Sequence, residues 1–194
     1  MRRLAAAFVV LFASTVAAAA APITYTAVLT GAAEDPPNVS LGTGTATVTI
    51  DIVAHTLDVS ATFAGLSGIT TASHIHCCTL LPGQGLAGVA TETPTFSLFP
   101  LGVQSGSFSE SYDLTDVLSF NAPFVTANGG TAAGAEAALA AGLAGGSAYL
   151  NIHSDLYRGG EIRGFLTPAA VPEPVSLSLL GLGLIGLAVR RRRA

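Results

Sequence analysis

The amino-acid sequence predicts a mainly β protein, an antiparallel β-sandwich of the immunoglobulin-like type with one short alanine-rich helix. An N-terminal signal peptide and a C-terminal transmembrane helix are expected to flank it. Three observations support this fold class. Apolar and polar residues alternate with a period of two along several stretches, turn residues separate these stretches, and one alanine-rich stretch breaks the pattern.

Residues 1–20 have the order of a secretory signal peptide. Arg2 and Arg3 precede an apolar run from residue 4 to residue 16, and small residues with Ala-x-Ala cleavage sites follow. Cleavage just before Ala21 is expected, because a proline directly after the cut suits signal peptidase poorly. The sequence therefore predicts an exported protein that begins near Ala21.

Four stretches of the N-terminal half are expected to be strands. Residues 24–29, 43–52 and 57–66 alternate, and a turn at His55 joins the last two into an antiparallel hairpin. Residues 74–76 are also expected to be extended.

The C-terminal half is expected to hold shorter strands and the helix. Residues 88–92 and 105–114 are strand candidates. Residues 132–143 predict a helix, because Thr131 is a suitable N-cap, alanine is abundant and two glycines end the run. Residues 147–153 and 161–166 predict a closing hairpin.

The body, residues 21–168, has the length of one domain with one core. It holds 11 Asp or Glu against Arg158 and Arg163, a net charge of −9, and the whole chain lacks lysine. This charge repels nucleic acid, so we expect no nucleic-acid partner. Cations, basic partners or simple solubility fit the charge better.

Residues 169–194 are expected to form a separate C-terminal segment. Residues 175–189 are uncharged and mostly apolar, and an arginine cluster follows them. As a helix they would span roughly 22 Å, short of a hydrocarbon core of about 30 Å, so they predict a marginal transmembrane helix. The arginines keep the tail cytoplasmic while residues 21–174 lie outside.

This tail resembles the PEP-CTERM sorting signal of Gram-negative bacteria. The resemblance implies transient anchoring in the inner membrane, processing by an exosortase, and delivery to the cell envelope, the cell surface or the extracellular (biofilm) matrix. An ordinary tail anchor is the alternative. The residues that carry the resemblance are Val171, Pro172, Glu173, Pro174, Arg190, Arg191, Arg192 and Arg193.

Residues 74–78 place two histidines beside two cysteines, in a chain with only four His and two Cys. In a strand, His74 and His76 share one face. Tyr149, Asn151 and His153 share a face of the closing hairpin, so three imidazoles converge if these strands are neighbours.

The body also resembles the CHRD domain, named from chordin, over about residues 23–167. Cys77 and Cys78 stand where a glycine commonly follows in that family. The resemblance implies a β-sandwich module without an established enzyme activity. Its signature in this chain is His74, His76, Tyr149, Asn151, His153, Gly160, Glu161, Arg163 and Gly164.

Three interpretations of the histidines stay open. They donate hydrogen bonds to backbone carbonyls and join the two halves of the sandwich, or they bind Zn²⁺ or Cu²⁺, with Cys77 or Cys78 as an added ligand. The third is redox use of the cysteines, which as neighbours can pair with each other only in a strained ring.

Two further side chains carry an expectation. Glu161 and Arg163 lie two apart and are expected to satisfy one another or to clamp the turn at residues 154–160. His55 is expected to be solvated.

The sequence thus predicts a non-catalytic, exported binding or structural module, handled by signal peptidase and an exosortase, with an unknown surface or matrix partner. No cofactor is established. The alternative is a Cu or Zn protein that uses His74, His76 and His153, with a possible redox role.

Overall fold

The computed structural model describes residues 21–170. The predicted signal peptide, the sorting residues and the predicted transmembrane helix lie outside the described residues. Within residues 21–170, no helix combines the length and apolar character needed to cross a membrane.

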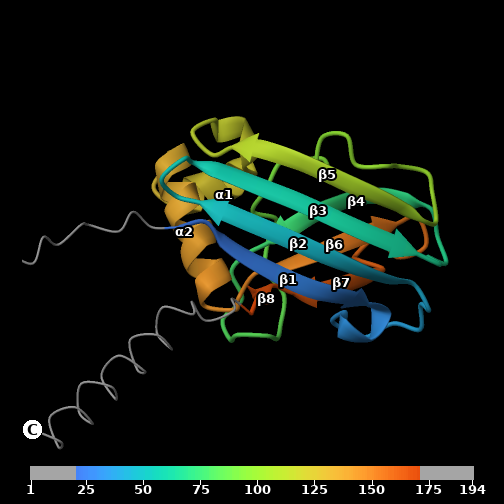
Figure 1. Ribbon diagram of the computed structural model, residues 1–194. Coiled ribbons are helices and arrows are strands. Elements are labelled where there is room, and N and C mark those ends of the chain that lie inside the picture. Colours follow the sequence, from blue (N-terminus) through green and yellow to red (C-terminus); the bar gives the residue numbers. More distant parts are fainter. Residues whose placement is uncertain (1–20, 171–194) are drawn as a thin grey trace, which may run out of the picture.

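The described chain forms an eight-stranded antiparallel sheet, with two α-helices at one end (Figure 1). The mainly β, antiparallel fold class is confirmed. The elements are β1 (Ile23–Thr30), β2 (Thr43–Asp51), β3 (Thr56–Ala64), β4 (Thr70–His76), β5 (Gly106–Asp113), α1 (Ala122–Ala127), α2 (Ala132–Ala144), β6 (Tyr149–Ser154), β7 (Ile162–Phe165) and β8 (Thr167–Pro168).

The sheet curls into a half-barrel, so that β4, β6 and β7 lie behind β1, β2, β3 and β5 (Figure 1). The curl is located between β7 and β1, which pair only at Arg163 and Thr30, whereas β1 pairs with β2 along its whole length. One continuous sheet therefore supplies both layers of the expected sandwich.

Alternating side chains from both layers fill the space between them. Leu29, Val48 and Val59 point inward from the front layer, and Ile75 and Ile152 point inward from the back layer; all five are buried. Threonine and valine favour such strands because branched side chains pack well on a pleated surface. The core therefore follows from the period-two pattern.

The helix α2 covers one end of the sheet, where Leu139 and Leu143 are fully buried. Thr131 caps it as predicted, because its side chain accepts a hydrogen bond from the Gly134 N–H. Sequence reasoning missed the short helix α1, which begins beside a proline and carries buried Phe124 and Val125.

Two local expectations were wrong. Residues 88–92 form no strand, but make isolated bridges through Val89 and Thr91. His55 is not merely solvated, because its Nδ1 lies 2.9 Å from the Glu136 carboxylate and ties the β2–β3 turn to α2.

Gly164 provides a test of the close approach between β7 and β1. A Cβ there would overlap the Val28 carbonyl oxygen and lie 3.1 Å from the Ala27 Cβ. We expect Gly164→Ala to lower the free energy of unfolding by about 1–3 kcal/mol, as overpacking does. Denaturant unfolding measures this change. Gly159→Ala is the control, because no heavy atom lies within 4 Å of its Cβ position; equal stability of the two variants would contradict the assignment.

Candidate functional site

Three histidines gather on the outer face of the back layer. His74 and His76 come from β4 and His153 comes from the adjacent β6, where Ala72 is paired with His153. Period-two alternation places these rings opposite Ile75 and Ile152, which point into the core. The expected convergence of the three imidazoles is present: their ring centroids lie 5.3–5.9 Å apart.

Loops cover this face, so the rings are shielded from solvent. His74 and His76 are 6% and 8% exposed, and His153 is half-buried. Burial leaves each ring nitrogen dependent on a partner inside the protein.

Each ring donates one hydrogen bond to a loop carbonyl. The His74 Nε2 lies 2.7 Å from the Pro94 oxygen, and the His76 Nδ1 lies 2.9 Å from the Ala87 oxygen. The third bond joins the His153 Nδ1 to the Arg158 oxygen at 3.0 Å. Because a carbonyl oxygen only accepts, each of these nitrogens carries the proton.

The other nitrogen of each ring is buried and has no partner within residues 21–170. These atoms are His74 Nδ1, His76 Nε2 and His153 Nε2. One potential ligand nitrogen per ring lies within 4.8 Å of those of the other two rings. A neutral imidazole whose first nitrogen donates outward keeps a lone pair on its second nitrogen, so each of the three neighbouring rings keeps one lone pair without a partner in the described residues.

Burial also keeps the rings neutral. It lowers the pKa of His76 to about 4, against the opposing effect of the hydrogen bond to Ala87. Burial likewise lowers the pKa of His74 and of His153. Because these pKa values fall below that of an unfolded histidine, the metal-free protein loses stability as the pH falls below about 6.5.

Two neighbouring side chains support the cluster. The Tyr149 ring stacks on His76 with centroids 4.9 Å apart and planes 6° from parallel. The Arg163 guanidinium lies 4.7 Å from the Tyr149 ring centroid and donates to the carbonyls of Ala33 and Gly85. These contacts hold the covering loops against the strands.

Arg163 pairs with Glu34, not with Glu161 as expected. Its Nε lies 3.8 Å from the Glu34 Oε2. Burial raises the pKa of Glu34 to about 7, although Arg163 opposes this rise. Glycine is required at position 160, because a Cβ there would lie 2.7 Å from the Glu34 Oε1 and 2.6 Å from the Asn151 Oδ1.

Of its two expected roles, Glu161 does not pair with Arg163, but it does contact the turn at residues 154–160 through a side-chain hydrogen bond with Ser154. Its buried carboxylate accepts hydrogen bonds from the Ser40 hydroxyl and from the Ser67 and Gly68 backbone N–H groups. It therefore joins the loop before β2 to the loop before β4. These hydrogen bonds lower its pKa against the effect of burial.

Cys77 and Cys78 are joined by a disulfide, directly after β4. Both sulfur atoms lie against Gly142 of α2, where a Cβ would overlap them. A disulfide sulfur is not a thiolate, so the described cluster offers three nitrogen ligands and no sulfur ligand.

Sequence reasoning missed Glu34 and the three carbonyl partners of the histidines. The one available signal for Glu34 was the acidic residue itself, in the polar, proline-containing loop at residues 34–42. The carbonyls belong to Ala87, Pro94 and Arg158, residues whose side chains give no hint of this role.

Two family models match the chain. The model of the CHRD domain matches residues 25–166. The model of the PEP-CTERM protein-sorting motif matches residues 170–193. No curated protein and no solved structure matches the chain.

The raised pKa of Glu34 predicts that the free energy of unfolding depends on pH. The folded pKa of about 7 exceeds the unfolded value of about 4.3, so ionising Glu34 destabilises the fold as the pH rises through that interval. Between about pH 5 and pH 8 we expect the wild type to lose a few kcal/mol relative to Glu34→Gln, which does not titrate. Denaturant unfolding in the presence of a chelator measures this difference. The histidines titrate equally in both proteins, and a pH-independent difference would contradict the assignment.

Proposed function

The chain belongs to the CHRD domain family and carries a PEP-CTERM sorting motif, so it is an exported protein sorted by an exosortase to the envelope or surface, and we propose that its domain binds Zn²⁺ or Cu²⁺. The ligands of the proposed ion are His74, His76 and His153. The proposal rests chiefly on one observation, the three buried ring nitrogens that lack a partner within the described chain.

The type of ligand restricts the ion. Neutral imidazole suits Zn²⁺ and Cu²⁺, whereas Mg²⁺ and Ca²⁺ take oxygen ligands. Nitrogens bound to zinc at 2.0–2.1 Å lie roughly 3.3 Å from one another in a tetrahedral site. One nitrogen of each ring now lies within 4.8 Å of one nitrogen of each other ring, so binding an ion would bring these nitrogens closer together. The carbonyl hydrogen bonds already select the tautomers that such binding requires.

We propose a structural, non-catalytic use of the ion. The ring partners lie in the two connections that cover the site, Ala87 and Pro94 between β4 and β5, and Arg158 between β6 and β7. An ion that fixes the rings therefore also fixes the loops, and it stabilises the folded module because the unfolded chain holds no assembled site. An exported module gains resistance to unfolding in this way.

Metal content tests this proposal directly. We expect about one Zn²⁺ or Cu²⁺ per chain in the full protein, purified without a histidine tag. We expect almost none in His74→Ala/His76→Ala, and a melting temperature that rises with added ion only in proteins that retain the site. Elemental mass spectrometry and thermal unfolding measure the two effects.

Two control variants separate loss of the site from loss of any histidine and from loss of the fold. His55→Ala removes the histidine that lies outside the cluster, where it pairs with Glu136, and should keep the ion. His76→Gln retains an N–H for the Ala87 carbonyl and should fold while binding the ion more weakly. A well-folded wild type that takes up neither ion would overturn the proposal.

A further inference from the structure

The outer face of the front layer is open and has an unusual chemistry. Most outward-pointing side chains of β1, β2, β3 and β5 bear a hydroxyl, and they are exposed or half-buried. The exceptions are Val28, Asp51, Asp58, Ala64 and Asp113. We name the centre of this surface the hydroxyl face; it consists of Thr26, Thr45, Thr47, Ser60, Thr62 and Ser109.

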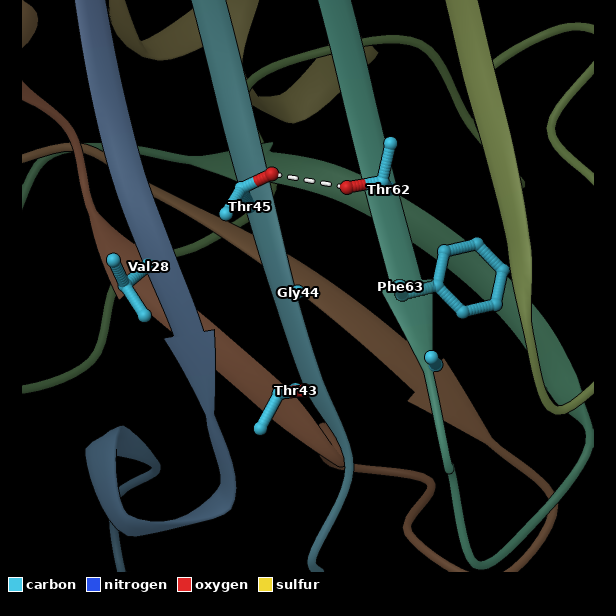
Figure 2. Close-up of a pocket in the computed structure, with 7 residues that line it drawn as sticks. Val28, Thr43, Gly44, Thr45, Thr62 and Phe63 are labelled. Atoms are coloured by element: carbon cyan, nitrogen blue, oxygen red, sulfur yellow. Dashed lines mark hydrogen bonds between the residues drawn. The ribbon is translucent and has the colours of Figure 1, made fainter.

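Strand register places these hydroxyls in rows. Thr26 is paired with Thr47, Thr47 with Ser60, and Ser60 with Ser109. Neighbouring strands lie about 4.7–4.9 Å apart and residues two apart on one strand lie about 6.6–6.8 Å apart, so the hydroxyls form a regular array. In the next row, the Thr45 and Thr62 hydroxyls share a hydrogen bond of 3.0 Å (Figure 2).

The array is uncharged, although the body carries a net charge of −9. Asp58 lies one row away, opposite Thr49, and Asp51 and Asp113 lie at the far end beside the β2–β3 turn. The acids at outward-pointing positions of the front layer, Asp51, Asp58 and Asp113, thus stand toward one margin, and the six residues of the hydroxyl face carry no charge.

Shallow hollows follow one another across this face. A hollow of about 350 Å³ is lined by Val28, Gly44 and Thr62 (Figure 2). A second of about 340 Å³ lies beside Thr26 and Thr167, and a third of about 220 Å³ lies between Thr47 and Ser107. All three are lined in part by Thr45, so the hollows adjoin on this face.

We propose that the hydroxyl face binds a neutral polysaccharide outside the cell. Sugar rings carry hydroxyl groups at their edges and C–H groups on their faces, which match a surface of hydroxyls and methyls. A repeating polymer also suits a repeating array, because each contact is weak and many are needed.

Charge and composition argue against the other occupants. An anionic polymer, or a second copy of this chain, would be repelled by a body of charge −9. The centre of a protein–protein interface is typically rich in aromatic side chains and arginine. The six residues of the hydroxyl face include neither. This proposal does not depend on the metal site, which lies on the other layer.

Co-sedimentation of the full protein with insoluble cellulose, and affinity electrophoresis in dextran and in alginate, test the proposal. Chelator is present throughout, so that failure of the metal proposal does not affect the result. We expect retention by at least one neutral glucan and none by anionic alginate.

Matched substitutions locate the surface. Thr45→Val/Thr47→Val/Thr62→Val removes three hydroxyls with little change in shape, and should weaken binding about tenfold or more. Thr71→Val/Thr126→Val, at exposed threonines elsewhere, should bind as the wild type. Equal binding by the triple variant, retention by neither neutral glucan, or a dimer in solution that the triple variant dissociates would each overturn the proposal.

Discussion

Polar side chains buried under loops must find hydrogen-bond partners inside the protein, and this constraint organises the back layer. Each histidine of the cluster donates to a loop carbonyl, His74 and His76 to the β4–β5 connection and His153 to the β6–β7 loop. Arg163 donates to the β1–β2 loop and to the β4–β5 connection, and Glu161 accepts from the β1–β2 and β3–β4 loops. These buried side chains therefore help to fix the loops, which also hydrogen-bond to one another, as Gly83 does to the Gly146 carbonyl.

The same constraint explains why each ring of the cluster keeps one nitrogen with a free lone pair. A structural histidine needs only one hydrogen bond to hold a loop, and that bond fixes which nitrogen carries the proton. The second nitrogen is then left with a lone pair in a space from which water is largely shut out. The structural role and the proposed ligand role are therefore compatible, because they use different nitrogens of each ring.

The two outer faces of the half-barrel differ because their loops differ. Loops cover the back layer and bury its polar side chains, whereas the front layer stays open and carries short hydroxyl side chains. A threonine on an open strand needs no protein partner, because water or a ligand can satisfy it. The module therefore combines a closed polar cluster with an open polar surface.

Much of this architecture could be predicted from the sequence. Alternation located the long strands, and it placed His74 and His76 on one face and His153 on another strand. Their meeting required only that β4 and β6 be neighbours, which the structure shows. Thr131 and the alanine run predicted α2 to within one residue.

Long-range loop contacts could not be predicted. Glu34 meets Arg163 across more than one hundred residues, and Glu161 meets Ser40 at a similar separation. Neither pairing produces a periodic pattern in the sequence. The expected Glu161–Arg163 pair was wrong because Glu161 precedes β7 and its side chain contacts other loops. His55 likewise met Glu136 only through the placement of α2.

X-ray absorption spectroscopy at the zinc edge, on protein loaded with Zn²⁺, tests the central claim most directly. The account predicts three imidazole nitrogens at about 2.0–2.1 Å from the ion and no sulfur neighbour. A sulfur shell at about 2.3 Å, or a shell of oxygen atoms alone, would show that the ion binds elsewhere or opens the disulfide, and would contradict the account.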